Sequence, residues 1–565
     1  MYKKLHNQTE LLKRKTEILE KIPDITRDGY SKKKIPVGLD TIIIGSGIGG
    51  LSCGAILSKI GKKVLVLEQH YIAGGCTHTF EDKGYEFDTG VHYIGNIEKR
   101  KKVFDLLTEK PIEWDQMGKL ENGYCYDEIN IEGKMYYLRS GEYLFLKEIE
   151  NTFPDELKNV KRYIQDVKKI ASKDMFFLLK VIKWKWLSGF LNLIAGRQFR
   201  KYLHMTALEG VQQYTSNKEL QAVLLGQFGD YGKLPSKESF FLHCSIVNHY
   251  LNGGWFPRGG SSMIAKQLIP TILHSGGRVL VRKKVKQILV NAKKQAYGVE
   301  MENGDKIFAK TIISACGIPN TWKRLVDKQF VPKSIKQNID DLGVSCSFMY
   351  VFVGMKCTPE TLQLRSSNIW HWPDKDYDKM MNEFDKYPLI APMPMFIGFP
   401  CAKDSMWNTR YPNKSNAVIL TMMKYEHVKQ WEKEKQGKRG KDYEDFKQKM
   451  GNRILEEGLY HYYPEARKYV DYVEVASPLT FNHYINSLQG EAYGLENYPS
   501  RFKTIDWLRP ETHIENLFLT GQDICTLGIT GALMSGVITT SRICNYGTLL
   551  DLVSGRNIIQ DLSNL

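Results

Sequence analysis

Asp40-Thr-Ile-Ile-Ile-Gly45-Ser-Gly47-Ile-Gly49-Gly50 is the stretch of sequence that determines the fold. Its short β-branched run ends in glycine, which is typical of a buried strand. Residues 51–59 predict a helix, and Lys63-Val-Leu-Val-Leu-Glu68 predicts a second buried strand. This spacing fits a strand–helix–strand crossover of about thirty residues, which joins parallel strands. The sequence therefore predicts an α/β protein with a parallel sheet.

The glycines of this stretch follow the pattern G-x-G-x-x-G. Gly45 permits a tight turn, Gly47 lets the backbone approach a pyrophosphate, and Gly50 allows close helix–strand packing. Glu68 lies eighteen residues after Gly50, where a carboxylate accepts hydrogen bonds from an adenosine ribose. A glycine turn in an ordinary α/β fold is the simpler alternative, but the strand, helix and carboxylate together favour dinucleotide binding. We expect further contacts from Ser46, Gly49 and Gln69.

Two more features favour a flavin over a nicotinamide cofactor. The pair Gly74-Gly75 follows Glu68 closely, where a loop can pass beside the cofactor. Far along the chain, an apolar strand in Leu519-Thr-Gly-Gln-Asp-Ile524 ends in Gly521 and Asp523, and glycines follow it. These residues can present another helix N-terminus and a carboxylate to the ribityl hydroxyls. A β-turn explains this second stretch equally well when it is taken alone. In combination with the first motif, it predicts FAD.

Composition limits the other classes of function. The chain has 565 residues, of which 42% are hydrophobic and 25% charged, so it can form one large core or two to three domains. Its net charge of +16 suits nucleic acid, an anionic membrane or anionic ligands. Because no nucleic-acid-binding motif is present, a membrane surface is favoured. The ten cysteines are scattered without a CxxC pair, which predicts reduced thiols and no metal site.

Residues 174–202 combine apolar side chains at helical spacing with lysine and arginine. Trp184 and Trp186 suit the boundary between lipid headgroups and acyl chains, so this segment can lie on a membrane surface. A buried helix of the substrate domain explains the pattern equally well. No apolar run reaches the length of a membrane span, and the Lys-rich N-terminus lacks the apolar core of a secretory signal.

Beyond the dinucleotide motif, the chain resembles the FAD-dependent phytoene desaturase and carotenoid isomerase superfamily, from about residue 40 to 545. Within that superfamily it is most similar to the retinol saturase (all-trans-retinol 13,14-reductase) group. The Asp88–Gly95 and Lys403-Asp404 stretches are the more selective parts of the resemblance. The segments that carry it are residues 81–95, 254–261, 399–404, 477–480, 490–494 and 519–523.

The resemblance implies where FAD binds and what reacts. Gly45, Gly47, Gly50, Glu68 and Asp523 match the family's FAD-binding positions, and Val285 matches a backbone contact with the adenine. Cys76 stands where many relatives have arginine. The implied substrate is a hydrophobic polyene or lipid, with NAD(P)H as a candidate reductant. The implied location is the endoplasmic reticulum membrane or another organelle membrane, reached by peripheral contact.

We therefore expect a discontinuous Rossmann-like FAD-binding domain with an inserted α+β substrate domain. The FAD domain is expected in residues 40–140, 255–330 and 505–550. The substrate domain is expected in residues 141–254, with the membrane-surface segment, and in residues 331–504. Residues 1–39 form a basic appendage and residues 551–565 a C-terminal tail.

Four side chains are candidates for catalysis: His92, Tyr93, Glu491 and Tyr493. His92 and Tyr93 follow Asp88-Thr-Gly90, near the expected flavin, and the other two lie in the 490–494 segment. A structural role, as a hydrogen-bonded core histidine or a packing tyrosine, is at least as common for such residues. In flavin chemistry the cofactor carries the hydride, so the protein positions the alkene and supplies a proton.

The predicted reaction is saturation of one carbon–carbon double bond in a retinoid-like polyene, with hydride from reduced flavin and a proton from a side chain or water. A carotenoid cis–trans isomerase or a desaturase is an alternative, because all three need a flavin beside a polyene. A flavoprotein-fold subunit with a structural or lipid-binding role in a membrane complex is another, because fold does not fix function.

Overall fold

The computed structural model describes residues 22–172, 179–182, 184–195, 197–502 and 508–544. A five-stranded sheet has the order β10-β2-β1-β14-β20, and every neighbouring pair in it is parallel. This sheet confirms the predicted α/β class and the Rossmann-like core. Its strands are β1 (Thr41–Ile44), β2 (Val64–Leu67), β10 (Arg278–Leu280), β14 (Thr311–Ser314) and β20 (Leu517–Leu519).

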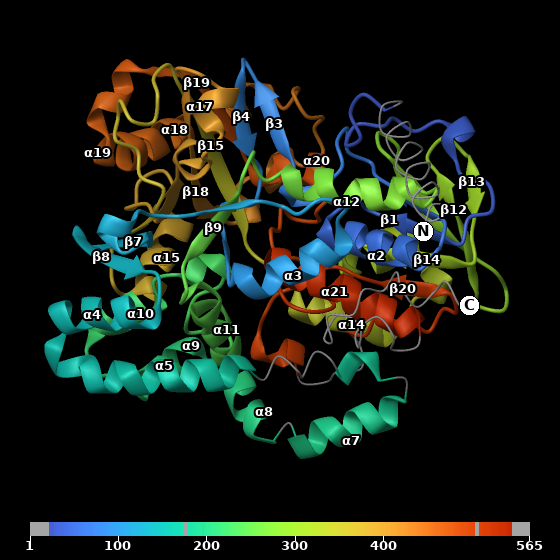
Figure 1. Cartoon of the computed structure of the whole chain (residues 1–565), viewed down its shortest axis with the longest axis horizontal. Helices are drawn as coiled ribbons and strands as arrows, with labels where there is room; N and C mark the ends of the chain where they lie inside the picture. Colours follow the sequence, from blue (N-terminus) through green and yellow to red (C-terminus); the bar gives the residue numbers. More distant parts are fainter. Residues whose placement is uncertain (1–21, 173–178, 183, 196, 503–507, 545–565) are drawn as a thin grey trace, which may run out of the picture.

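Helices cover one face of the parallel sheet, at the right of Figure 1. Helix α2 (Ile48–Lys59) packs between α12 (Met263–His274) and α21 (Gly528–Ile543), and α3 (Ile97–Leu107) lies against it. Small residues let these helices approach closely. A Cβ at Gly536 would lie 2.0 Å from Oγ of Ser52, and one at Gly54 would lie 2.8 Å from the Ile272 side chain. Helix α2 starts three residues before the predicted Leu51, inside the glycine motif.

The opposite face of the parallel sheet carries an antiparallel sheet of β11 (Val285–Val290), β12 (Ala296–Met301) and β13 (Lys306–Phe308). Ile42, Leu65 and Leu280 of the parallel sheet share one buried apolar core with Ile288 and Val299 of this layer. The segment after β14 continues through α13 (Ile318–Asn320) and a π-helical turn (Thr321–Leu325) to α14 (Lys333–Leu342).

A second, seven-stranded sheet stands at the upper left of Figure 1. Its order is β19-β15-β18-β17-β16-β7-β8, and only the β16–β7 pair is parallel. Its longest strands, β15 and β18, are buried along almost their whole length. The strands are β7 (Cys125–Ile131), β8 (Lys134–Arg139), β15 (Ser347–Met355), β16 (Asn368–Trp372), β17 (Met395–Gly398), β18 (Ser415–Met423) and β19 (Val470–Ala476).

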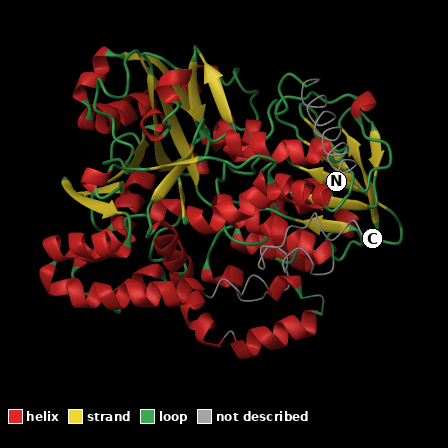
Figure 2. Ribbon diagram, in the orientation of Figure 1, coloured by secondary structure: helices red, strands yellow, loops and turns green. Residues whose placement is uncertain are grey.

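Helices gather below this sheet, as Figure 2 shows. They are α4 (Glu142–Thr152), α5 (Leu157–Ala171), α7 (Lys185–Ala195), α8 (Arg197–His204), α9 (Ala207–Gln212), α10 (Lys218–Leu225) and α11 (Phe240–Tyr250). Further helices follow in the second half of the chain: α15 (Tyr377–Lys386), α16 (Pro400–Lys403), α17 (Trp407–Arg410), α18 (Gly440–Ile454), α19 (Tyr460–Tyr462) and α20 (Pro478–Tyr484).

Two small sheets lie between the larger ones. Strands β3 (Thr79–Asp82) and β4 (Tyr85–Asp88) form a hairpin. Strand β9 (Gly254–Pro257) pairs with β5 (Ile94–Gly95) and β6 (Trp114–Gln116), and thereby joins segments that are far apart in sequence.

Two boundaries differ from the predictions. The predicted domain boundary after residue 140 falls too late, because β7 and β8 pair within the seven-stranded sheet. The predicted appendage is in part a piece of the core: Gly29 bridges Val281, and the amide of Ala73 donates to the carbonyl of Thr26.

The described part of residues 174–202 includes α7, whose apolar side chains are largely exposed. Phe176 and Phe177 of the predicted apolar face, residues 1–21 and the predicted tail at 551–565 lie outside the described residues. All ten cysteines are described and free, which confirms the predicted thiols. No described helix combines the length and apolar character that crossing a bilayer requires.

Candidate active site

A cavity of about 300 Å³ opens at the carboxyl ends of the parallel strands. The loops after β1, β2, β14 and β20 form its walls, which is where open α/β sheets bind ligands. Residues of the 484–494 segment, which follows the seven-stranded sheet, close the remaining side. The cavity therefore lies between the two large sheets of the molecule.

The glycines of the first motif differ in what surrounds them. A Cβ at Gly50 would lie 2.2 Å from the carbonyl oxygen of Gly45, so only glycine lets α2 pack this closely. A Cβ at Gly49 would lie 2.8 Å from backbone atoms of Gly521. A Cβ at Gly47 would meet no protein atom within 4 Å, and Gly47 lines the cavity. Gly47 thus leaves open space where a pyrophosphate would approach the helix N-terminus.

Glu68 ends β2 and lines the cavity as a nearly buried carboxylate. Its Oε2 accepts hydrogen bonds from the amide of Ser46 at 2.9 Å and from Oγ of Ser46 at 2.7 Å, and its Oε1 accepts from the amide of His70 at 2.9 Å. Oγ of Ser46 also accepts from the amide of Gly74 at 3.1 Å. Ser46 and Glu68 thus hold the two glycine loops together, and a carboxylate has lone pairs left for a ribose.

Asp523 is buried at the opposite end of the cavity. Its Oδ1 accepts from the amide of Leu495 at 2.8 Å, and its Oδ2 accepts from the amide of Ile318 at 2.8 Å. Gly494 and Gly317 make room for it, since a Cβ at Gly494 would lie 2.3 Å from Oδ1. The carboxylate therefore fixes three loops around the cavity and keeps lone pairs for hydroxyl donors.

Most of the predicted cofactor contacts are brought together in this one cavity, and their residue types fit FAD. Ser46 and Gly50 support it from behind without lining it. The predicted residues that line it are Gly45, Gly47, Gly49, Glu68, Gln69, Gly74, Gly75, Val285, Gly521 and Asp523. No group of three or more metal-ligating side chains occurs among the described residues.

Of the four predicted catalytic residues, Glu491 and Tyr493 line the cavity. The carboxylate of Glu491 accepts hydrogen bonds from the amides of Leu488 at 2.9 Å and Gln489 at 2.7 Å. Burial raises the pKa of Glu491 above its ordinary value. The hydroxyl of Tyr493 donates to the carbonyl oxygen of Gly229 at 3.2 Å.

His92 and Tyr93 lie outside the cavity wall, although Gly90 and Val91 belong to it. The ring of His92 lies 5.0 Å from that of Phe396, and its pKa is lowered to about 3 by burial and by the nearby Lys403 ammonium. His92 is therefore neutral. The Tyr93 hydroxyl points to two carboxyl groups, those of the buried Asp127 and the partly buried Asp230.

Sequence reasoning missed several residues of the cavity, above all His70 and His78. Their rings lie 4.7 Å apart, and burial lowers the pKa of each to about 4. Nδ1 of His78 lies 2.6 Å from the carbonyl oxygen of Gly75, so this histidine holds the second glycine loop. The sequence offered no periodic signal for either residue; only their closeness to Glu68 and Gly75 could have suggested them.

A row of aromatic rings leads from the cavity wall towards the seven-stranded sheet. Tyr493 contacts Phe348, with ring centroids 6.3 Å apart, and Phe348 contacts Tyr350 at 6.2 Å. Tyr350 faces His92 at 6.2 Å, and His92 in turn contacts Phe396. Phe396 ends the row against Trp370 at 4.7 Å. The core beside the cofactor cavity thus consists of apolar, polarisable rings that begin at the cavity wall with Tyr493.

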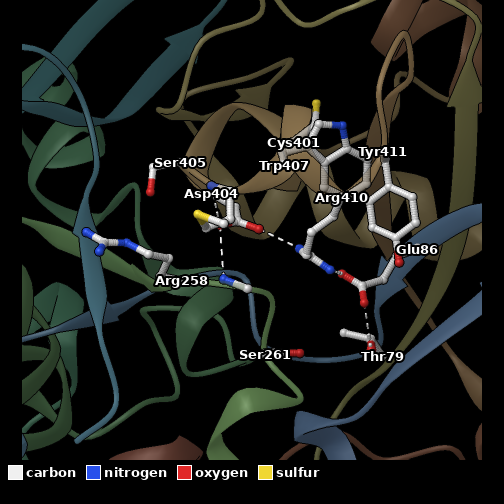
Figure 3. Close-up of polar contacts among 12 residues, drawn as sticks. Thr79, Glu86, Arg258, Ser261, Cys401, Asp404, Ser405, Trp407, Arg410 and Tyr411 are labelled. Carbon is white, nitrogen blue, oxygen red and sulfur yellow. Dashed lines mark hydrogen bonds and ion pairs between the residues drawn. The ribbon is translucent and has the colours of Figure 1, made fainter.

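An ion-pair network around Arg410 joins three of the segments that carry the resemblance, 81–95, 254–261 and 399–404 (Figure 3). The Arg410 guanidinium donates to Oε1 of Glu86 at 2.8 Å and to Oδ2 of Asp404 at 2.6 Å. Oδ1 of Asp404 accepts from the amide of Gly259 at 3.0 Å. Arg258 pairs with Asp115 at 2.8 Å. These contacts tie the connection between β17 and β18 to the β3–β4 hairpin and to the loop that follows β9.

Fold and cavity together define an FAD-dependent oxidoreductase. The model of the family described as flavin containing amine oxidoreductase matches residues 48–544 of this chain. The solved structure of cyclohexylamine oxidase from Brevibacterium oxydans IH-35A shares the fold, with a TM-score of 0.56 and 13% identity, over 91% of this chain and 99% of that chain.

Curated relatives narrow the group. All-trans-retinol 13,14-reductase of Danio rerio is 35% identical over 96% of this chain and 91% of its own length. A Danio rerio protein named inactive all-trans-retinol 13,14-reductase is 30% identical over 94% and 90%. Chloroplastic prolycopene isomerase of Daucus carota is 26% identical over 93% and 84%. The chain belongs to the flavin containing amine oxidoreductase family and, within it, to the group that contains the all-trans-retinol 13,14-reductases.

Proposed function

We propose that the protein saturates one carbon–carbon double bond of a retinoid-like polyene. The observation that carries the proposal is the aromatic row from Tyr493 to Trp370, because it begins at the wall of the cofactor cavity and offers apolar, polarisable surface to a polyene. The similarity to all-trans-retinol 13,14-reductases supports it. Bound FAD in its reduced form supplies a hydride with its electron pair.

The chain's own residues would bind and orient the two reactants. We propose that Gly45, Gly47 and Glu68 hold the adenosine and pyrophosphate end of FAD, and that Asp523 holds its ribityl chain. The rings of Tyr350 and Phe396 would hold the polyene flat by apolar burial and offset stacking. The same rings exclude water, which protects a reactive polyene from side reactions.

The test is an anaerobic single turnover. The holoenzyme is reduced with dithionite, all-trans-retinol is added, and flavin absorbance and retinoid products are followed together. Reoxidised flavin with a dihydro product supports the proposal. Persistent reduced flavin with a cis–trans isomer contradicts it and supports the isomerase alternative, which the similarity to prolycopene isomerase favours. Persistent reduced flavin with unchanged retinol contradicts it and supports a non-catalytic subunit, as the inactive relative would suggest.

The reductant is proposed to be NAD(P)H. Oxidised holoenzyme is mixed anaerobically with NADPH or NADH, and bleaching of the flavin absorbance is recorded. Bleaching by either nucleotide supports this proposal. Flavin that stays oxidised with both, yet is reduced by dithionite, contradicts it and leaves the donor to another class of two-electron carrier.

We further propose that α7 contacts a membrane surface, for which the endoplasmic reticulum is the first candidate. Trp186, Leu193 and Ile194 are 72%, 64% and 62% exposed, and Trp184 and Phe190 extend this apolar patch. Lys185 and Lys201 are exposed nearby and suit anionic lipid. The substrate of the proposed reaction is lipid-soluble and must leave a bilayer to reach the enzyme. Contact between the patch and the membrane would allow this transfer.

Sedimentation with anionic phospholipid vesicles tests the membrane proposal. The double variant Trp186→Ser/Phe190→Ser should lose most of the vesicle-bound fraction. Tyr143→Ser is the matched control, because Tyr143 is 75% exposed on α4 and lies outside the patch. Equal binding of the double variant and wild type would contradict the assignment.

A further inference from the structure

The hydroxyl of Tyr93 lies between two carboxyl groups, those of the buried Asp127 and the partly buried Asp230. It is 2.9 Å from Oδ2 of Asp127 and 2.7 Å from Oδ2 of Asp230. A tyrosine hydroxyl has one proton, so it donates one hydrogen bond and can only accept the other. The second contact therefore needs a proton on a carboxyl group. One of the two aspartates is a neutral acid.

Hydrogen-bond donors identify Asp127 as the anion. Nε2 of Gln227 donates to its Oδ2 at 2.7 Å, and Nδ2 of Asn368 donates to its Oδ1 at 2.8 Å. The side-chain oxygen of Asn368 in turn accepts from the Lys403 ammonium. Donors of this kind favour the ionised carboxylate. Among the described residues, only Tyr93 hydrogen-bonds the Asp230 carboxyl, so Asp230 carries the proton and donates it to the Tyr93 oxygen.

The charges around the pair agree with this assignment. Burial and the neighbouring Asp127 carboxylate hold the pKa of Asp230 well above its ordinary value. Burial also raises the pKa of Asp127, to about 6, while hydrogen bonds from Asn368, Gln227 and Tyr93 oppose the rise. The other titratable groups that face the pair are Tyr126, Tyr231, Tyr250, Tyr493, the thiol of Cys125 and the ammonium of Lys403.

Asp230 lies next to the cofactor cavity. The carbonyl oxygen of Gly229, its neighbour in the chain, accepts a hydrogen bond from Tyr493, and Tyr493 lines that cavity. Asp230 itself is partly accessible. Tyr493 thus links the wall of the cofactor cavity to the backbone beside this neutral acid, and its ring begins the aromatic row that would hold a polyene.

We propose that Asp230 is the proton donor of the polyene reduction, with Tyr93 and Asp127 as its positioning residues. This inference rests on the proposed function. One alkene carbon takes the proton of Asp230, and the other takes the hydride with its electron pair. The double bond is reduced to a single bond, the flavin is oxidised, and Asp230 is left as a carboxylate that regains a proton from water. Conjugation and the neighbouring aromatic faces stabilise the positive charge that develops on the polyene.

The first test compares Asp230→Asn with Asp166→Asn in the dithionite-reduced holoenzyme. Asp166 is the matched control, because it also accepts a hydrogen bond from a tyrosine, Tyr214, at 2.8 Å. In Asp230→Asn we expect reoxidation of flavin by all-trans-retinol to slow by about 100-fold or more, with unchanged flavin content and retinol affinity. Asp166→Asn should react like wild type. Reoxidation of Asp230→Asn within about threefold of wild type would overturn the proposal.

A second readout does not depend on turnover. Other buried carboxyl groups with raised pKa values, among them Glu238 and Asp88, contribute to the infrared spectrum of the oxidised holoenzyme. The difference spectrum of wild type minus Asp230→Asn at neutral pH should therefore isolate the carbonyl stretch of one protonated carboxylic acid. That difference band should shift in D₂O and should be absent from the spectrum of wild type minus Asp166→Asn. A wild type minus Asp230→Asn spectrum without the band would overturn the assignment of the neutral acid. Wild type that shows the band but never reacts with retinol would overturn the proposed function, and with it the donor role, while leaving the neutral acid established.

Discussion

The two ends of the central cavity are built on different principles. At the cofactor end, backbone shape dominates: Gly45, Gly47, Gly49 and Gly50 set the loop, and strand ends point into the cavity. At the seven-stranded end, side chains dominate, because aromatic rings, the Tyr93 carboxyl pair and the Arg410 network come from segments far apart in sequence.

This difference explains why one end determines the cofactor and the other determines the substrate and the reaction. A cradle of backbone and glycine binds the same dinucleotide in many oxidoreductases, because its contacts depend little on side-chain identity. A surface of rings and buried charges determines which substrate fits and where a proton lies, and single substitutions can change it. Fold alone therefore identifies the cofactor class, while the seven-stranded end decides the reaction.

Gly50→Val should produce the largest effect and fall entirely on the cofactor end. The added Cβ would lie 2.2 Å from the carbonyl oxygen of Gly45, a backbone atom that cannot move without reshaping the loop. We expect flavin content after purification to fall at least about tenfold, equal to a loss of about 1.4 kcal/mol or more in binding. Gly29→Ala is the control, since its Cβ would meet nothing within 4 Å. Normal flavin content in Gly50→Val would contradict the packing role.

Arg410→Met should destabilise the seven-stranded end. Arg410 pairs with Glu86 and Asp404, whose side chains are only 8% and 1% exposed, so its loss leaves two buried carboxylates unpaired. We expect the free energy of unfolding to fall by about 3 kcal/mol, the lower end for breaking a buried pair, because Arg410 is itself 26% exposed. Denaturant unfolding measures it. Arg467→Met breaks an exposed pair with Glu456 and should leave the free energy of unfolding almost unchanged, because solvent screens that pair. Equal costs would show that burial of the network is irrelevant.

The same contrast explains how far the sequence predicts the molecule. The glycine motif and Glu68 lie within thirty residues of each other. Local sequence patterns are therefore enough to predict strand β1, helix α2, strand β2 and the positions of these residues at the cavity. Asp523 was predictable for the same reason, because it follows an apolar strand and precedes the glycine-rich start of a helix. Ser46 was expected as a cofactor contact, but it supports the site by bonding Glu68 instead.

At the seven-stranded end, local rules fail. Tyr93 was proposed beside the flavin because it follows Gly90 closely in sequence, yet its hydroxyl turns to Asp127 and Asp230. Those partners are 34 and 137 residues away, and no periodicity connects them. Strands β7 and β8 look like a continuation of the first domain, because their pairing with β16 depends on a segment over two hundred residues later. Such contacts are decided by tertiary packing.

His78→Asn should make stability at the cofactor end less sensitive to acid. Burial holds the pKa of His78 at about 4, against an ordinary value of 6.5. Below pH 6.5 the His78 imidazole binds a proton in the unfolded chain but not in the folded chain. The free energy of unfolding therefore falls as the pH drops from 6.5 to 4. Removing His78 should reduce this loss by about 2 to 3 kcal/mol, while asparagine can still donate to Gly75. Thermal unfolding at several pH values measures it. Parallel curves for variant and wild type would show that His78 does not titrate in this way.

Asp230→Asn should change stability with the opposite pH dependence. The raised pKa of Asp230 means that the folded chain keeps a proton which the unfolded chain loses above its ordinary pKa of about 3.9. Wild-type stability therefore carries a penalty that grows as pH rises from about 4 and is absent below it. Asparagine donates the same hydrogen bond to Tyr93 without titrating, so the variant should be more stable than wild type at pH 7 and equal to it below pH 4. Denaturant unfolding at both pH values checks this. The prediction is contradicted if the variant is less stable than wild type at pH 7, or if its gain in stability persists in acid. Either result would mean that Asp230 and His78 do not change stability with pH in opposite directions.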